Sequence, residues 1–299
     1  MADIQLNRFS IRDIENLTGI KAHTIRIWEQ RYGILQPKRT DTNIRYYDAD
    51  DLKVALRISL LNNHGYKISR IHQMSAHDMS SLIQKINDSG FKLQLLVSEL
   101  LEATLAMDID LFEELLNGYL KKNGVEDMVE QLIFQYLEKI GMMWMTDRIF
   151  PAQEHLISNV IYRKLAVAIE TLPPKQPDAG PKVLLFLPEG ELHDIGLMYI
   201  YYMLLKNGKA PIYLGPNTPL QDALLVYTHM KPEYVYIHLT APANEFDVNK
   251  YVYKLEAHFK DSTVLLSGGA ITSKKIVSRP HNVKILKNLE EVRNVLSDI

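Results

Sequence analysis

The stretch VLLFLPEGELHDIG, residues 183–196, runs from an uninterrupted apolar segment through a carboxylate-rich loop to a glycine. A short apolar run bounded by turn residues is typical of a buried strand, and the residues from Asp194 onward carry apolar side chains at helical spacing. The stretch therefore predicts a strand, a loop and a helix. The loop is either an ordinary strand-to-helix turn or a device that offers His193 to a large ligand approaching the backbone at Gly196.

Further strand segments follow this one, and helical segments lie between them. The predicted strands cover residues 182–187, 210–214, 234–239, 263–268 and 283–286. The predicted helices cover residues 194–208, 220–230, 247–259, 272–278 and 289–299. Regular alternation of strands and helices predicts a flavodoxin-like, doubly wound parallel sheet, here forming an α/β domain over residues 183–299.

Polar and glycine-rich loops follow the first, third and fourth of these strands. Ligands of doubly wound sheets bind beyond the carboxyl ends of the strands, where the strand order reverses. The candidate binding residues at that point are Glu191, His193, Gly196, His238, Thr240, Ser267, Gly268 and Gly269. His193 can ligate a metal if Glu191 or Asp194 fixes its other ring nitrogen. The alternative is a plain loop histidine, since an E-x-H-x-x-G pattern alone is weak.

Upstream of the sheet, the segment LPPKQPDAGPK, residues 172–182, contains four prolines and a glycine. This composition predicts a linker over residues 173–182. Before the linker, apolar residues recur at three- and four-residue spacing in the segments 93–108, 109–122, 125–144 and 151–172. Four helices with short joints predict a four-helix bundle within a domain of residues 77–172.

The N-terminal segment, residues 1–76, has the pattern of a winged helix-turn-helix. Ser10 is a suitable N-cap for a first short helix that ends at Gly19, and a second helix begins near Ala22. The turn-rich segment KRTDTNIRYYDADDL, residues 38–52, then predicts a small β-wing followed by a helix. The predicted fold class is therefore multidomain, with α domains followed by an α/β domain.

Charge supports a nucleic-acid partner for this first segment. Residues 1–76 contain twelve Lys and Arg and eight Asp and Glu, a net charge of +4, so the remainder carries −6. The N-terminal end of a recognition helix meets base edges, and neighbouring cations meet phosphates. The candidate DNA-binding residues are His23, Thr24, Arg26, Arg31, Lys38, Arg39, Arg45 and Tyr46. The alternative is a solvated, charged helical face.

The bulk composition narrows the class of protein. The absence of cysteine excludes disulfides, thiolate metal sites and cysteine nucleophiles. No segment has the apolar length of a signal peptide core or a membrane span. We therefore expect a cytoplasmic protein without a membrane partner.

The segment TIRIWEQRYGILQPKRTDTNIRYY, residues 24–47, resembles the winged-helix domain of MerR-family transcription regulators over about the first 75 residues. The wing tip departs from the family pattern, because Asp41 to Ile44 stands where a Gly-Gly-His type of turn is common. The resemblance implies a double-stranded DNA operator as partner and a homo-oligomer, dimer or tetramer. It does not imply an enzyme.

The segments ELHDIG, YLGPNTP and LSGGA resemble the cobalamin-binding domain of corrinoid proteins, with His193 as the lower ligand of cobalt and the glycine pair along the buried nucleotide tail. The segment WMTDRIFPAQEH, residues 144–155, resembles the bundle motif of CarH-type and LitR-type repressors, which use adenosylcobalamin as a light sensor. That resemblance implies that Trp144 packs over the upper face of the corrin. It also implies that Glu154 and His155 contact the adenosyl group.

Two positions depart from the corrinoid pattern. His238 stands where a small serine is usual, so its imidazole either crowds the nucleotide tail or pairs with Glu191. Met145 stands where light-sensing members can carry a histidine that captures cobalt after photolysis.

The whole chain predicts a DNA-binding transcription regulator whose cobalamin or light state is coupled to oligomerisation and operator binding. The resemblance alone implies that the regulator represses transcription. One alternative is the same regulator with a degenerate ligand domain that acts through protein partners. Another is a corrinoid carrier subunit, which the winged helix disfavours.

Overall fold

The computed structural model describes residues 7–173, 180–240, 246–272 and 281–299. The chain divides into two compact units between Val160 and Ile161. This division falls inside helix α9, Pro151–Glu170. Most of the predicted linker, residues 174–179, lies outside the described residues. The domain boundaries predicted at residues 76 and 172 stay predictions, and each unit is described below by itself.

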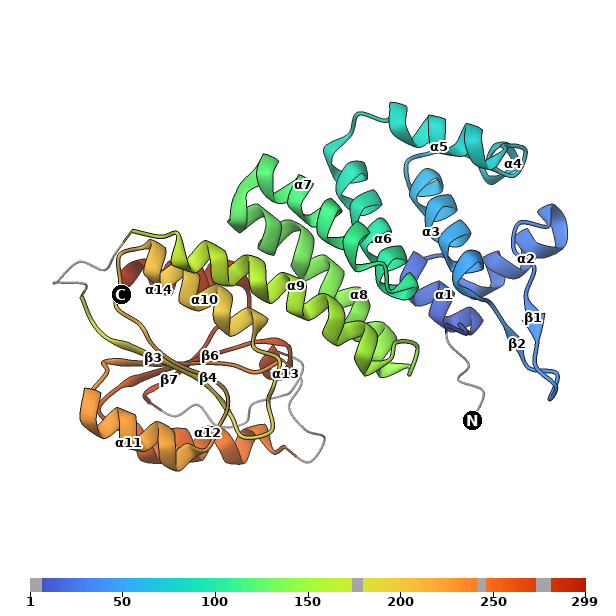
Figure 1. The fold of residues 1–299 in the computed structure, drawn as a ribbon. Helices are drawn as coiled ribbons and strands as arrows, with labels where there is room; N and C mark the ends of the chain where they lie inside the picture. The colour runs from blue at the N-terminus through green and yellow to red at the C-terminus, as the bar shows by residue number, and fades with distance from the viewer. Residues whose placement is uncertain (1–6, 174–179, 241–245, 273–280) are drawn as a thin grey trace. The chain divides into compact units, whose positions relative to one another are not determined.

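The first unit opens with the predicted winged helix-turn-helix (Figure 1). Its elements are α1 Ile11–Thr18, α2 Ala22–Tyr32, β1 Lys38–Arg39, β2 Arg45–Tyr46 and α3 Ala49–Asn63. Ser10 caps α1 in a reciprocal capping box with Asp13, and Gly19, at φ 76°, ends the helix in the left-handed conformation. The wing strands β1 and β2 pair antiparallel.

Two short helices follow that the sequence analysis did not predict, α4 Ile68–Ile71 and α5 Ala76–Lys85. Ser75 and Asp78 form another reciprocal capping box at the start of α5, so the S-x-x-D pattern at residues 75–78 was the available signal. Side chains from α3, α4, α5 and α6 meet in one apolar cluster that includes Leu61, Ile83 and Phe91.

The four predicted bundle helices are present with small shifts of their ends. They are α6 Ser89–Ala106, α7 Ile109–Asp127, the π-helical turn η1 Met128–Ile133 continuing into α8 Phe134–Met145, and α9 Pro151–Glu170. Gly124 has φ 85° and breaks the helical path between the second and third predicted helices. Tyr136 is buried in the bundle, and its hydroxyl lies 2.7 Å from the Thr104 hydroxyl.

The second unit contains a five-stranded parallel sheet in the order β4-β3-β5-β6-β7. The strands are β3 Val183–Pro188, β4 Ile212–Thr218, β5 Tyr234–His238, β6 Thr263–Ser267 and β7 Val283–Ile285. This order is the flavodoxin-like order that the sequence predicted. The chain order reverses between β3 and β5, which are hydrogen-bonded neighbours.

Helices cover both faces of this sheet. Their bounds are α10 Ile195–Lys206, α11 Leu220–Met230, α12 Val248–His258, α13 Gly269–Thr272 and α14 Leu289–Asp298. Helices α10 and α14 lie over one face, and α11 and α12 lie over the other (Figure 1). From Ser273 onward, the helix predicted over residues 272–278 lies outside the described residues. Every residue of β3 is buried, because helices cover both faces.

Among the described residues, no helix combines the length and apolar character that crossing a membrane requires.

Candidate functional site

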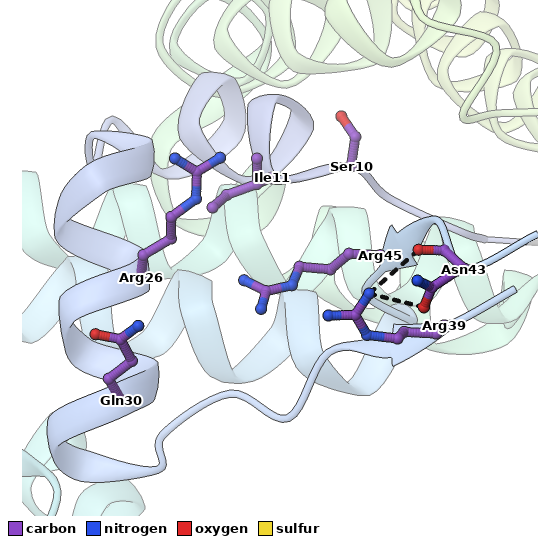
Figure 2. A pocket seen from close by; sticks show the side chains of 7 residues that line it. All are labelled: Ser10, Ile11, Arg26, Gln30, Arg39, Asn43 and Arg45. Carbon is purple, nitrogen blue, oxygen red and sulfur yellow. Dashed lines mark hydrogen bonds between the residues drawn. The ribbon is translucent and has the colours of Figure 1, made fainter.

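The winged helix-turn-helix holds a hollow of about 390 Å³ between α2, the wing and the start of α1 (Figure 2). Its lining residues are Ser10, Ile11, Arg26, Gln30, Arg39, Asn43 and Arg45. Three of them are arginines, and no carboxylate belongs to this described lining. Figure 2 shows the Arg45 guanidinium extending from the wing toward the helix that carries Arg26. Such a concentration of cations suits an anionic backbone such as that of DNA.

The wing arginines are held in place by neighbours. Arg39 Nη1 donates to the Asn43 carbonyl oxygen at 3.2 Å and to Asn43 Oδ1 at 2.9 Å. Asn43 has φ 63°, a left-handed conformation that asparagine tolerates better than most residues. Asn43 therefore supplies, at the divergent wing tip, the turn conformation that glycine would otherwise provide.

Arg45 is anchored to the recognition helix. Its Nη1 lies 2.8 Å from Glu29 Oε2, and the Glu29 side chain is only 8% exposed. The other carboxylate oxygen of Glu29 accepts a hydrogen bond from the Tyr47 hydroxyl. Glu29 thus fixes the wing against α2 and offsets part of the charge of Arg45.

The remaining predicted DNA contacts lie outside the lining of the hollow. His23 is exposed in the first turn of α2, with its Nε2 3.3 Å from the Thr24 hydroxyl. Lys38 is paired with Asp48, the N-cap of α3. The guanidinium of Arg31 lies over the Tyr32 ring, 5.5 Å from its centroid.

Two positions near the wing, Arg8 and Gln30, were not predicted from the sequence. The Arg8 guanidinium lies 4.5 Å from the centroid of the Tyr46 ring, so Tyr46 supports a cation at the base of the wing. Gln30 joins the hollow one turn after Arg26 on α2, and its i+4 spacing was the signal that could have found it.

In the second unit, Glu191 organises the point where the strand order reverses. Its carboxylate is fully buried. Glu191 Oε1 accepts hydrogen bonds from the His193 backbone N–H at 3.0 Å and from His193 Nδ1 at 2.6 Å. Glu191 Oε2 accepts from the Thr240 backbone N–H at 3.1 Å, which joins the loop after β3 to the end of β5. Because Nδ1 faces Glu191, Nε2 is the ring nitrogen that would bind a metal.

Asn217, near the end of β4, also holds the His193 loop and was not among the predicted residues. Its Oδ1 accepts from the Gly190 N–H at 2.9 Å, and its backbone N–H donates to the Glu191 carbonyl oxygen at 3.0 Å. On the other side of His193, Asp194 is buried and accepts a hydrogen bond from the Tyr213 hydroxyl at 3.2 Å. Burial raises the pKa of Asp194 above its ordinary value.

The remaining predicted residues of this unit converge, and they pack against one another. His238 Nδ1 lies 2.8 Å from Ser267 Oγ, which in turn lies 2.7 Å from the Tyr236 hydroxyl. A Cβ placed on Gly196 would lie 2.5 Å from His238 Nε2, and a Cβ on Gly268 would lie 2.2 Å from the Leu239 carbonyl oxygen. Two positions of His238 were expected, one crowding the nucleotide tail and one pairing with Glu191; the structure places the ring against Gly196 with Ser267 as hydrogen-bond partner.

These residues fit one part of a corrinoid and not another. The carboxylate-held imidazole of His193 is a suitable ligand for cobalt. By contrast, the bulky His238 ring stands against Gly196, so this part of the site does not fit a buried nucleotide tail.

The predicted upper-face residues lie in the first unit, near the loop between α8 and α9. The side chains of Trp144 and Met145 are 46% and 78% exposed at the end of α8. In the first turns of α9, Glu154 Oε2 lies 2.9 Å from His155 Nδ1, and the Ser158 hydroxyl donates to the same carboxylate. A large exposed indole at the end of α8 and a carboxylate–imidazole pair in the first turns of α9 are compatible with a ligand surface.

The loop after Trp144 is bonded to the helix-turn-helix. Arg148 Nε lies 2.7 Å from Asp13 Oδ2, and Asp13 is only 4% exposed. The same Asp13 oxygen accepts from the Ser10 backbone N–H at 2.6 Å. Lys139 Nζ on α8 donates to the Leu17 carbonyl oxygen near the end of α1 at 3.1 Å. No sequence pattern indicated these contacts, because the partners are more than 100 residues apart.

Comparison with known proteins agrees with both parts of this description. Residues 9–78 match the MerR HTH family of regulatory proteins, and residues 96–169 match a B12 binding domain. The chain is 24% identical over 290 residues to the HTH-type transcriptional repressor CarH of Myxococcus xanthus, covering 95% of this chain and 96% of the relative. It is 26% identical over 230 residues to the repressor CarA of the same organism, covering 75% of this chain and 74% of the relative.

Among solved structures, the monomethylamine corrinoid protein of Methanosarcina barkeri is similar with a TM-score of 0.54 and 19% identity. The similarity covers 69% of this chain and 98% of that one. At this identity the likeness concerns the fold.

Proposed function

This chain combines a MerR-type helix-turn-helix with a B12-binding domain and is homologous to the repressors CarH and CarA over most of its length, and we propose that it is a DNA-binding transcription regulator controlled by a corrinoid. Arg26, Arg39 and Arg45 would meet the DNA, and His193 would ligate cobalt. The repressor sign follows the names of the two relatives.

The observation that carries the proposal is the ion pair between Arg148 and Asp13. Arg148 lies in the loop that follows Trp144, and Asp13 caps the helix whose first residues, Ser10 and Ile11, line the arginine hollow. A ligand that changes the position of this loop therefore acts directly on α1. Coupling of this kind needs only that the ligand bind one arrangement of the loop better than the other.

The resemblance of residues 144–155 to light-sensing repressors suggests adenosylcobalamin as the ligand form. Trp144 would cover the upper face of the corrin, and Glu154 and His155 would contact the adenosyl group. The active species would be a homo-oligomer whose assembly changes with the ligand or light state.

The DNA half is tested by selecting duplexes from a library with a randomised core of ~30 bp, long enough for two half-sites. Fluorescence anisotropy then measures affinity for a selected duplex and for a scrambled one. Arg26→Ala should reduce discrimination between them, because Arg26 points from the recognition helix into the hollow. Failure of the wild-type chain to prefer any duplex would overturn the DNA half of the proposal.

The ligand half is tested by repeating the titration with adenosylcobalamin and with diaquocobinamide, in the dark and after illumination, with size exclusion at each step. A ligand-dependent change in DNA affinity or oligomeric state supports corrinoid control. The second candidate is a regulator whose ligand domain has lost the corrinoid and acts through a protein partner; the His238 ring against Gly196 favours it. Sequence-specific DNA binding with no corrinoid absorbance on the protein would select this candidate.

A further inference from the structure

A corrinoid held by His193 raises the question of where the displaced base of cobalamin goes. In cobalamin the benzimidazole is joined through a ribose phosphate to the rim of the corrin, on its lower face. When a protein histidine takes its place on cobalt, the whole nucleotide remains on the same side as that histidine. It must then lie beside the His193 loop, next to the first turn of α10 and the ends of β5 and β6.

The imidazole of His238 lies at this position. Gly196, in the first turn of α10, has its Cα against the imidazole of His238: an added Cβ would lie 2.5 Å from Nε2 and 2.6 Å from Cδ2. On the far side of β5, an added Cβ on Gly268 would lie within 3 Å of the Leu239 carbonyl oxygen, carbonyl carbon and nitrogen. Contacts within the protein therefore require glycine at both positions.

His238 is fixed in this position by polar contacts. Its Nδ1 bonds to the buried hydroxyl of Ser267, which also bonds to the fully buried hydroxyl of Tyr236. Burial lowers the pKa of His238 to about 4, so the ring is neutral near pH 7 although the Glu191 carboxylate opposes this shift. Among the described residues, the buried side-chain atoms without a partner are Tyr251 Oη and Asn282 Oδ1, and neither belongs to this network. Ser267 thus holds the His238 ring through Nδ1 and links it to Tyr236.

We propose that His238 takes the place of the nucleotide and makes this site selective for corrinoids that lack it, the cobinamide class. This inference rests on the proposed function, since it takes His193 as the cobalt ligand. The corrin ring itself needs only the approach to His193 and does not use the space that His238 fills. Binding of cobalamin would require His238 to leave Ser267 and would expose a buried hydrogen-bond network.

The test compares diaquocobinamide with aquocobalamin, titrated into the full-length chain and followed by visible absorbance. Three proteins are compared: wild type, His238→Ser, which clears the space, and His238→Gln, which keeps the bulk and a hydrogen-bonding group. Displacement of the benzimidazole disfavours aquocobalamin equally in all three. The diagnostic quantity is therefore the change in the ratio of the two Kd values. His238→Ala repeats the comparison if His238→Ser does not fold, as judged by circular dichroism.

We expect His238→Ser to improve the affinity for aquocobalamin relative to diaquocobinamide by about tenfold or more, and His238→Gln to leave the ratio at its wild-type value. The same ratio in wild type and His238→Ser, with both corrinoids bound, would overturn the inference and leave the proposed function standing. Binding of neither corrinoid to any variant would overturn the ligand half of the proposed function and the inference with it. If wild type bound neither corrinoid while His238→Ser bound both, His238 would block the corrin ring itself. That result would also contradict the proposed selectivity.

Discussion

At the scale of single residues, Glu191 decides the chemistry of His193. One buried carboxylate accepts from the His193 backbone, from its Nδ1 and from the backbone of Thr240. This arrangement selects the tautomer in which Nδ1 carries the proton and Nε2 is basic, which is the form a metal requires. The carboxylate at residue 191 is therefore as much a part of the candidate site as the histidine.

Replacing His193 with Ala should abolish or greatly weaken corrinoid binding, because the only nitrogen proposed to reach cobalt is removed. Glu191→Gln should weaken binding by about 10–100-fold, the usual effect of losing the group that orients a metal-binding histidine. Absorbance titration with diaquocobinamide measures both effects. An unchanged spectrum and affinity in His193→Ala would show that His193 is only a loop residue.

Arg45→Ala should weaken binding to all DNA sequences and lower the slope of log affinity against log salt by about one contact. The loss should be smaller than for an arginine without an acidic partner, because Glu29 already offsets part of the charge. Lys122→Ala is the matched control, since Lys122 is an exposed cation on α7 in the bundle. Equal slopes for wild type and Arg45→Ala would argue against the wing as a phosphate contact.

Met145 leads to a prediction about light. Its thioether is a poor ligand for the hard cobalt(III) left by aerobic photolysis, and the side chain is 78% exposed beside Trp144. We therefore expect that illuminating the adenosylcobalamin-loaded protein under air gives no stable bis-histidine spectrum, whereas Met145→His gains one. A bis-imidazole spectrum in the wild type that disappears in His155→Ala would show instead that His155 binds the upper face.

At the scale of elements, the joint between α8 and α9 is bonded to α1. Arg148 supplies the charge, Asp13 is nearly inaccessible to solvent, and Lys139 reaches the carbonyl end of the same helix. A short helix of eight residues is marginal by itself, so its position depends on these tertiary contacts. The first helix of the winged helix-turn-helix is thus held by side chains from α8 and from the loop that follows it.

Arg148→Met should lower the free energy of unfolding of the first unit by about 1–3 kcal/mol, because Asp13 would stay buried without its ionic partner. We expect a value in the lower part of this range, because the Arg148 side chain is 32% exposed and water screens its charge. Urea unfolding followed by circular dichroism measures the change.

Lys21→Met is the control for that measurement, since it removes an ion pair with Glu15 in which the lysine side chain is 71% exposed. An ion pair this exposed contributes little to stability, because water screens the two charges. Equal destabilisation by the two substitutions would mean that the Arg148–Asp13 pair has no special role in holding α1.

At the scale of the whole molecule, stability should depend on pH through His238. Its folded-state pKa of about 4 lies below the ordinary value of 6.5, so between these values the unfolded chain binds a proton that the folded chain does not. The contribution of the neutral His238 ring to stability is therefore fully present above about pH 6.5 and is lost as the pH falls toward 4. Near pH 5 the loss is about 2 kcal/mol. Unfolding of wild type and His238→Asn at both ends of this range gives the measurement. The same pH dependence in both proteins would contradict the burial of a neutral imidazole.

The helices and strands could be predicted because each depends mainly on the residues of its own short segment. Buried parallel strands are continuous apolar runs, helices show apolar spacing and caps such as Ser10, and alternation of the two leaves few topologies. The predicted strand order alone placed Glu191, His193, His238 and Ser267 at one edge of the sheet. The structure confirmed that strand order. Helices α4 and α5 were missed, although the capping pattern at Ser75 and Asp78 was present.

The sequence by itself determined the element types, the sheet order and the residues that gather at its switch point, since chain connectivity and side-chain periodicity set these. Only the tertiary structure decided which way His238 points, which group satisfies it, and that Arg148 reaches Asp13. These outcomes depend on the packing of side chains from segments far apart in the chain. The imidazole of His238 fills the space beside Gly196 because Ser267, on a neighbouring strand, offers its hydroxyl at 2.8 Å, and no pattern along the chain contains that distance.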